Sequence, residues 1–327
     1  MRRKTTTAAL SAAMSSGLLL AAASPAAASL ITLGDSTVDA GSAQIGARAV
    51  GAPDPAPASL GYFQGRFSNG LNAADFVSQD LFGTVTTSVL AGGRNYAFGA
   101  AAIVTDINQG IPGLPTQIPD LTDQVDALLA AGGIGADDDL YVGFGGNDFL
   151  AAARGVDDPD AIGMAALGVL SEQLRRLADA GATNVAVSNV NAAGFALGGA
   201  ADLAASVERY NTALADMLVE LSAQTGTRFA LADRDGVFDR IIADPLAFGF
   251  DPALLGRACV DDQSAVPGCD GYVLFDPIHV TEAAHRLIAD EVVAALRGDA
   301  DVVPLPGALA LFAAGFAAVF TAGRGKA

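Results

Sequence analysis

The feature that most constrains the fold is an alternation of short, apolar, β-prone runs with longer helical segments. Four such runs lie at residues 30–33, 139–144, 184–188 and 228–232. Between them, leucines recur at helical spacing before Gly181, and an amphipathic stretch covers residues 201–224. Strands that alternate with helices predict a parallel sheet covered by helices on both faces. No repeat or linker divides the chain, so we expect one α/β domain over residues 29–300.

Weaker signals lie between the first two runs. Residues 42–66 are rich in Gly, Ala and Pro and predict an exposed loop, and the next amphipathic stretch predicts a helix that ends at Gly83. Residues 84–90 are β-prone and lead into an expected strand and glycine turn at 92–101. A further helix is expected at residues 121–131.

The charge balance excludes one large class of partners. The 327 residues include 36 acidic and 18 basic side chains, which give a net charge of −18. Phosphate binding needs a basic footprint, so nucleic acid is not an expected partner. The chain has only two histidines, His279 and His285, so any histidine-dependent chemistry must use one of them.

The only two cysteines, Cys259 and Cys269, stand ten positions apart in a polar loop. In an exported protein we expect this pair to form a disulfide that closes the loop and contributes about 2–3 kcal/mol. A metal site is the alternative, but no further ligands of the right kind cluster nearby, and we expect no metal.

The N-terminus has the pattern of a secretory signal peptide over residues 1–28. A basic start is followed by a small-residue and leucine stretch and by Ala26-Ala27-Ala28, an Ala-x-Ala cleavage site before Ser29. A retained membrane anchor is the alternative, which the short apolar region disfavours. The mature protein is therefore expected to be periplasmic, cell-surface or secreted.

The C-terminus, residues 301–327, combines Val303-Pro304-Leu305-Pro306, an apolar run and a basic end. A helix over residues 305–322 would be about 27 Å long, which is marginal for a bilayer core of about 30 Å. This order resembles the bacterial Pro-Glu-Pro-type C-terminal sorting signals, in a Val-Pro-Leu-Pro version. The resemblance implies transient membrane association and cleavage by a sorting peptidase, whereas a plain tail anchor is the alternative.

A candidate nucleophile lies just past the first apolar run. The run ends at Gly34, where the backbone can turn, and Ser36 follows at the carboxyl end of the predicted strand. Open α/β sheets place their ligand sites at this edge. A nucleophilic serine also needs a base, an orienting acid and oxyanion donors.

A candidate base lies near the other end of the domain. Asp276 and His279 stand three residues apart on a turn that precedes a predicted helix. At this spacing the carboxylate can hold one imidazole nitrogen while the other faces a nucleophile. A helix-capping aspartate beside a surface histidine is the alternative interpretation. His285, inside the helix and next to Arg286, is expected to be a solvated side chain at the flank of that helix.

Together these stretches resemble the SGNH, or GDSL, family of serine hydrolases, in its lipase and acylhydrolase branch. The four conserved sequence blocks of the family are matched in order, and a further motif typical of the branch lies between the first two. The matching stretches are Gly34-Asp35-Ser36 with Asp39 and Gly41, Gly65-Arg66-Phe67-Ser68-Asn69-Gly70, Asn95-Tyr96-Ala97-Phe98-Gly99-Ala100, Gly145-Gly146-Asn147-Asp148 and Asp276-Pro277-Ile278-His279-Val280-Thr281. The resemblance implies a flavodoxin-like sheet in a three-layer α/β/α sandwich. The other large esterase fold is disfavoured, because the Gly-x-Ser-x-Gly elbow is absent around Ser36.

The resemblance also implies a role for each matching position. Ser36 would be the nucleophile, His279 the general base and acid, and Asp276 its orienting carboxylate. The Ser36 N–H and the Asn147 side chain would stabilise the oxyanion, and Asp35 and Asp39 would support the site.

A third oxyanion N–H is expected from the second block, where this sequence departs from the family. The family usually has two glycines, and this chain has Gly99-Ala100. Ala100 can supply the donor if its φ is negative, and Gly99 is the other candidate.

These observations predict an exported serine ester hydrolase that forms an acyl-Ser36 intermediate and needs no cofactor. Carboxylic esters with lipid or short acyl groups are the expected substrates. Deacetylation of extracellular polysaccharide is the alternative within the enzyme class. From another class, the alternative is a surface or matrix structural protein on an inactive hydrolase scaffold.

Overall fold

A computed structural model describes residues 28–104, 106–108, 117–197 and 201–298. Four parallel strands form one sheet in the order β1-β2-β3-β4, and their bounds are Leu30–Gly34, Asp139–Gly143, Asn184–Ser188 and Arg228–Ala232. In register, Leu30 lies beside Asp139 and Asn184 beside Arg228. The four apolar runs of the sequence therefore form the four strands, and the fold is the α/β class that their alternation with helices predicts.

Nine α-helices occur among the described residues: α1 (Ser42–Ala49), α2 (Ala73–Phe82), α3 (Leu121–Ala130), α4 (Gly146–Ala153), α5 (Pro159–Asp179), α6 (Ala192–Leu197), α7 (Ala201–Thr225), α8 (Arg234–Ala243) and α9 (Glu282–Arg297). Helix α2 ends at Gly83 as expected, because this residue adopts the left-handed conformation that favours glycine at a helix end. Helix α1 was not expected, since residues 42–66 were predicted to be loop. The carboxylate of Asp39 accepts hydrogen bonds from three N–H groups at the start of α1 and so offsets the weak helical signal.

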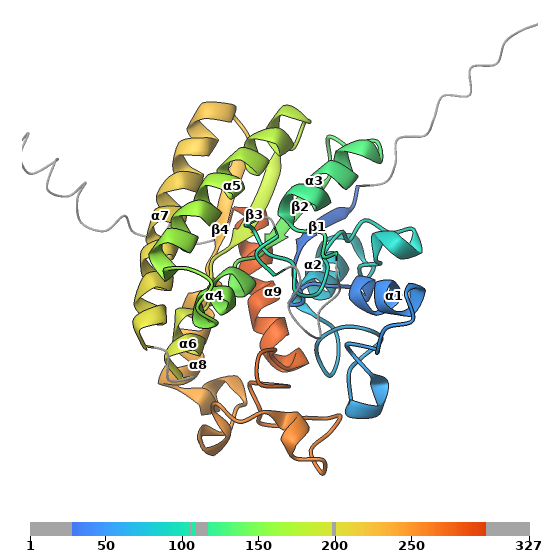
Figure 1. Ribbon diagram of the computed structural model, residues 1–327, viewed down its shortest axis with the longest axis vertical. Coiled ribbons are helices and arrows are strands. Elements are labelled where there is room, and N and C mark those ends of the chain that lie inside the picture. Colours follow the sequence, from blue (N-terminus) through green and yellow to red (C-terminus); the bar gives the residue numbers. More distant parts are fainter. Residues whose placement is uncertain (1–27, 105, 109–116, 198–200, 299–327) are drawn as a thin grey trace, which may run out of the picture.

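The helices cover both faces of the sheet and create two cores (Figure 1). Side chains alternate along each strand, so Leu140 and Val142 of β2 pack with α3, α5 and α7, whereas Tyr141 packs with α2, α8 and α9. Helices α5 and α7 lie side by side on the first face. The result is a three-layer α/β/α arrangement.

The edge of the sheet beyond β1 differs from the expectation. Residues 84–90 do not form a strand, and only isolated bridges join Ser88 and Thr32 to Asn95. The backbone of residues 94–98 nevertheless runs along β1, with hydrogen bonds from Thr32 N–H to the Arg94 carbonyl and from Tyr96 N–H to the Thr32 carbonyl. This irregular segment places the second sequence block directly beside the end of β1.

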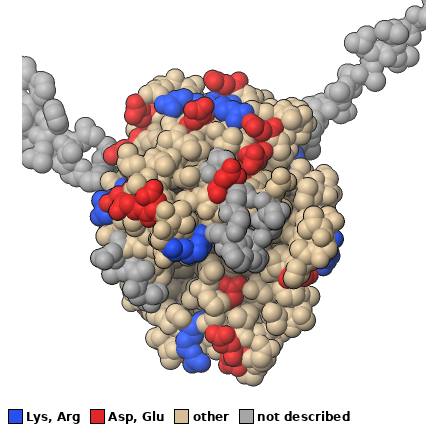
Figure 2. All heavy atoms as spheres, viewed as in Figure 1, with Lys and Arg blue, Asp and Glu red and all other residues tan. Residues whose placement is uncertain are grey.

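Charged side chains are mixed over the surface that Figure 2 shows. Basic side chains on that face lie beside acidic ones and do not form a patch. Among the described residues, Arg176 is paired with Asp126 and Arg209 with Asp160.

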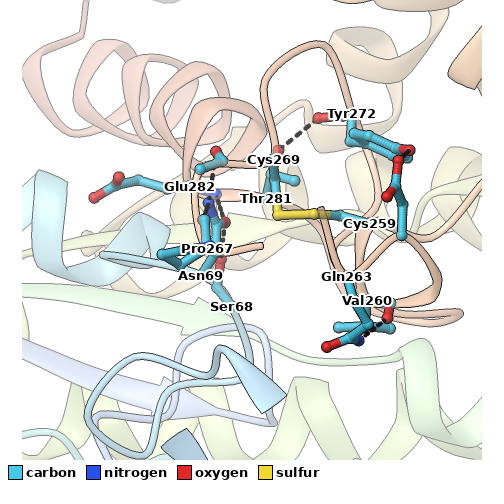
Figure 3. Close-up of a disulfide and its surroundings, with 12 residues drawn as sticks. Ser68, Asn69, Cys259, Val260, Gln263, Pro267, Cys269, Tyr272, Thr281 and Glu282 are labelled. Carbon is cyan, nitrogen blue, oxygen red and sulfur yellow. Dashed lines mark hydrogen bonds between the residues drawn. A yellow bond between two sulfur atoms is a disulfide. The ribbon is translucent and has the colours of Figure 1, made fainter. Parts of the chain in front are cut away.

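A disulfide between Cys259 and Cys269 closes the loop before the last sequence block, as expected. Asn69 binds this loop to the start of α9 (Figure 3), because its side-chain amide donates to the Pro267 carbonyl and its oxygen accepts from the Glu282 N–H. Asn69, in the N-terminal part of the domain, therefore binds two neighbouring segments of its C-terminal part.

The predicted signal peptide (residues 1–28) and C-terminal sorting signal (301–327) lie outside the described residues, apart from residue 28. Among the described helices, none is both long and apolar enough to cross a bilayer.

Candidate active site

Ser36 lies in a tight turn immediately after β1. A side chain at Gly34 would approach the Val38 side chain to 2.2 Å and the Gly143 carbonyl oxygen to 2.8 Å, so only glycine fits there. Asp35 N–H donates to the same Gly143 carbonyl and holds the turn against β2. The serine is thus fixed at the carboxyl edge of the sheet, where the sequence predicts it.

The loop before α9 brings a histidine and a carboxylate to Ser36. His279 Nε2 lies 2.8 Å from Ser36 Oγ, and His279 Nδ1 lies 2.7 Å from Asp276 Oδ2. The other oxygen of Asp276 accepts hydrogen bonds from the Ile278 and His279 N–H groups, which fixes the carboxylate within its turn. The structure therefore brings Ser36, His279 and Asp276 into one chain of hydrogen bonds.

The electrostatics favour one arrangement of protons in this chain. Burial raises the pKa of Asp276, but the hydrogen bond and charge of His279 and two backbone N–H groups lower it below its ordinary value overall. An ionised Asp276 accepts a hydrogen bond from the N–H at His279 Nδ1, which leaves Nε2 without a hydrogen and able to accept the Ser36 hydroxyl proton.

Tyr62 and Phe67 surround the histidine and the carboxylate. The Tyr62 hydroxyl donates to Asp276 Oδ2 over 2.8 Å, and the ring of Phe67 lies 5.0 Å from the His279 ring. Burial and the charge of Asp276 raise the pKa of Tyr62, which keeps this hydroxyl protonated. Sequence reasoning missed Tyr62, because a single tyrosine in a Pro- and Gly-rich loop carries no signal. Phe67 belongs to the family motif that the sequence matches at residues 65–70.

The candidate oxyanion donors are the backbone N–H groups of Ser36, Gly99 and Ala100 and the side-chain amide of Asn147. Within the part of the chain that the structure describes, the backbone N–H groups of Ser36 and Ala100 have no acceptor. The Gly99 N–H instead donates to Asp39 Oδ2 over 2.9 Å. The Asn147 side-chain amide donates to the Ala101 carbonyl over 2.8 Å and lines the same cavity as Ser36. The single hydrogen of the Gly99 N–H is therefore engaged, whereas the Asn147 amide keeps a second hydrogen that it does not donate to Ala101.

The backbone at Ala100 contradicts one expectation. Its φ is +69°, in the left-handed region, so the negative φ that was our condition for Ala100 as the third donor is not met. Its N–H nevertheless has no acceptor among the described residues. The Ala101 N–H closes a turn onto the Phe98 carbonyl, and the Asn108 side chain holds the Ala100 carbonyl. The surrounding bonds therefore impose a conformation that glycine would adopt more easily.

Asp35 and Asp39 are both buried and have structural contacts. Asp35 Oδ1 accepts from the backbone and the hydroxyl of Thr37, which shapes the turn around Ser36. Asp39 joins the start of α1 to the Gly99 N–H. Burial raises the pKa of Asp39 to about 6, although four backbone N–H groups oppose this shift. Both residues lie beside the site, and neither contacts Ser36 Oγ or His279 through a hydrogen bond.

A cavity of about 420 Å³ opens at Ser36, His279 and Asn147 and continues into the domain between α8 and α9. Its rim includes the exposed residues Pro277 and Ile278. Its walls are mostly apolar side chains, such as those of Leu150, Phe195, Phe238, Ile241 and Ile288. The cavity can hold an extended apolar group next to the serine.

Two polar residues line this cavity against expectation. His285 was predicted to be solvated, but it is only 2% exposed and faces inward from α9, because α9 is covered by α2 and α8 on this side. Arg234, which the sequence analysis did not single out, is only 6% exposed. Among the described residues, no group of three or more His, Cys, Asp or Glu side chains is arranged to hold a metal ion.

A serine, a histidine and a buried carboxylate in hydrogen-bond contact at the carboxyl edge of a parallel sheet define a serine hydrolase arrangement. The chain belongs to the GDSL-like lipase/acylhydrolase family, whose sequence model matches residues 30–292. It is therefore an ester-bond hydrolase on an α/β fold.

Matches to proteins that are named GDSL esterase/lipase cover most of this chain. A GDSL esterase/lipase of Arabidopsis thaliana is 27% identical over 273 residues, which cover 69% of this chain and 75% of the relative. Another from the same plant is 29% identical over 337 residues, which cover 84% and 88%. The structure of LAE5, an alpha/beta hydrolase enzyme from the metagenome of Lake Arreo in Spain, is similar with 15% identity and a TM-score of 0.48, and the match covers 83% of this chain and 95% of that one.

Proposed function

We propose that this chain is an exported serine esterase or lipase that cleaves carboxylic esters through an acyl-Ser36 intermediate. The observation that carries the proposal is the chain of contacts from Ser36 Oγ to His279 Nε2 and from His279 Nδ1 to Asp276, at 2.8 and 2.7 Å. Both distances are in the range that general-base activation of a serine requires.

The reaction has two halves. Ser36 Oγ attacks the ester carbonyl carbon and passes its proton to His279 Nε2. The bond from the carbonyl carbon to the alcohol oxygen then breaks, and His279 gives the proton to the departing alcohol. In the second half, His279 takes a proton from water, the hydroxide attacks the acyl-Ser36 carbonyl, and the acid leaves as Ser36 regains its proton.

Three donors would stabilise the negative oxygen of each tetrahedral intermediate. The Ser36 and Ala100 N–H groups have no acceptor among the described residues, and the Asn147 amide has a second hydrogen beyond the one it donates to Ala101. Gly99 is not one of the donors in this proposal, because its N–H is held by Asp39. One such donor contributes about 10²–10³ in rate to a serine hydrolase.

Export is part of the proposal. The N-terminal pattern at residues 1–28 is that of a secretory signal, and residues 301–327 resemble a C-terminal sorting signal. The disulfide between Cys259 and Cys269 supports an oxidising destination. Processing would leave the domain at residues 29–300.

The experiment compares the purified parent with Ser36→Ala on p-nitrophenyl esters of increasing acyl length. We expect the variant to lose at least about 10³-fold in kcat/KM, because the nucleophile is gone. Ser171→Ala, on α5 and outside the cavity, is the matched control and should keep the parent rate.

Labelling with a fluorophosphonate separates an active enzyme from an inactive scaffold. The parent should be labelled at Ser36 and the Ser36→Ala variant should not. Equal ester hydrolysis by parent and variant, or no labelling and no hydrolysis by the parent, would contradict the proposed function.

A further inference from the structure

The lining of the cavity includes a buried guanidinium whose Nε has no hydrogen-bond partner among the described residues. Arg234 begins α8 and lines the cavity that opens at Ser36, yet it is only 6% exposed. Its Nε is fully buried and has no hydrogen-bond acceptor, and the guanidinium forms no ion pair with any described residue. Buried charged donors in folded proteins are almost always paired, so this one needs a functional explanation.

The polar groups around Arg234 do not neutralise it. Asp35 lies near enough for the charge of Arg234 to lower its pKa, but burial raises that pKa more, and Asp35 Oδ1 is held by Thr37. The Tyr141 hydroxyl is bonded to Ser188. His285 also lines the cavity with an unpartnered Nδ1, and burial lowers its pKa to about 3, which keeps it uncharged at neutral pH. The cavity therefore offers a fixed positive charge and a neutral ring nitrogen.

Most other side chains that line this cavity are apolar. Phe238 and Ile241 from α8 and Ile288 from α9 line the cavity and are buried. These side chains suit a short methylene chain, whereas the guanidinium suits an anionic group with two oxygens in one plane. A ligand that satisfies both is a carboxylate carried on an alkyl chain.

The acyl part of an ester fits this enclosed position better than the alcohol part. The alcohol must leave before water can attack the acyl-enzyme, and Pro277 and Ile278, which line the cavity, are exposed to solvent. The acyl group stays on Ser36 through both halves of the reaction, so it can occupy the buried position beside Arg234.

We propose that Arg234 and His285 form a subsite for the free carboxylate of an ω-carboxyacyl group, so that the preferred substrates are half-esters of dicarboxylic acids. This proposal rests on the proposed function, with Ser36 as the nucleophile. The distal carboxylate is bound and takes no part in bond making. The Ser36 acyl bond forms and breaks as in any other ester of this enzyme.

The test uses mono-p-nitrophenyl esters of linear dicarboxylic acids from succinic to suberic acid. Each is compared with the same compound capped as a methyl ester at its free carboxylate, and spontaneous hydrolysis is subtracted. The parent should favour the free carboxylate over the capped compound by about 10- to 100-fold in kcat/KM at one or more lengths. Arg234→Met should abolish this preference, so that its kcat/KM values for the free and the capped esters differ by less than about threefold.

Two control variants separate binding from general charge effects. Arg234→Lys keeps the charge without the planar donor pair and should retain part of the preference. Arg175→Met removes one positive charge from the surface of α5, outside the cavity, and should leave the preference unchanged.

The subsite would be overturned by a parent that shows no preference for the free carboxylate at any chain length. It would also be overturned if Arg234→Met lowered kcat/KM for the free and the capped esters by the same factor. The neutral esters report on the proposed function separately. If Ser36→Ala hydrolyses the capped esters as fast as the parent, the proposed nucleophile is wrong. If Ser36→Ala is inactive on the capped esters and the parent shows no preference for the free carboxylate, only the proposed subsite is wrong.

Discussion

Among single residues, Ala100 combines an unused backbone donor with an unfavourable conformation. Its φ of +69° costs an alanine more than a glycine, and its N–H has no acceptor among the described residues. We predict that Ala100→Gly raises the free energy of unfolding by about 0.5–1 kcal/mol, because the released strain exceeds the extra chain entropy of glycine in the unfolded state. Urea unfolding measures this change.

Activity should be unaffected by this substitution, because glycine supplies the same N–H. The kcat/KM of Ala100→Gly should stay within about threefold of the parent. Ala101→Gly is the matched control, since residue 101 has no positive φ and its buried methyl group packs in the core. That variant should be destabilised, and equal effects of the two substitutions would refute the strain argument.

The residues that the sequence could predict are those within matched blocks. Ser36, Asp276 and His279 each lie in such a block, and the structure places them in contact. Tyr62 and Arg234 could not be predicted, because each depends on which distant residue the fold brings near it. His285 was predicted wrongly, since its neighbour in sequence, Arg286, is at the surface while α9 turns His285 inward.

Among the secondary-structure elements, the four strands and the long helices follow directly from apolar periodicity. Helix α7 was expected at 201–224 and covers Ala201–Thr225. Residues 84–90 are β-prone but form no strand, because β-propensity competes with tertiary contacts. The segment that lies along β1 is the next one, where the Asn95 side chain donates to the Val38 carbonyl. The expectation of a flavodoxin-like sheet came from the family resemblance, because apolar periodicity alone predicts only the α/β class.

The loop between Cys259 and Cys269 supports the histidine-bearing element. Asn69 binds this loop, and Thr281, at the start of α9, donates to the Tyr272 carbonyl just beyond it. A crosslink across ten residues restricts the unfolded chain and stabilises the fold by about 3 kcal/mol. We predict that reduction, or Cys259→Ser with Cys269→Ser, lowers the free energy of unfolding by about this amount.

Denaturant unfolding of the oxidised and reduced protein measures this effect. The double serine variant should match the reduced parent and should not respond to reductant. An unchanged free energy of unfolding in both cases would show that the contacts of Asn69 and Thr281 hold the loop without the crosslink.

For the whole molecule, buried carboxylates set the pH dependence of stability. Burial raises the pKa of Asp39 and Asp120 to about 6 and that of Asp148 to about 7, from an ordinary value of 3.8. Between pH 4 and 7 the folded chain therefore binds more protons than the unfolded chain, so stability falls as pH rises. The net charge of −18 acts in the same direction through self-repulsion.

We predict that the free energy of unfolding is greater at pH 5 than at pH 8 by at least about 2 kcal/mol, since one pKa unit corresponds to about 1.4 kcal/mol. Urea unfolding across this range measures the slope. Asp148→Asn cannot titrate and should show a shallower slope, whatever its absolute stability. A maximum of stability at or above pH 7, or an unchanged slope in the variant, would contradict this assignment.

The proposed nucleophile and base lie 243 positions apart, in the turn after β1 and in the loop before α9. During synthesis the serine is made early, and its histidine is made only after every strand of the sheet. A nascent or prematurely terminated chain therefore lacks its general base, whatever fraction of the sheet has formed. The order of the residues along the chain thus delays hydrolysis until translation is almost complete, without any inhibitory segment.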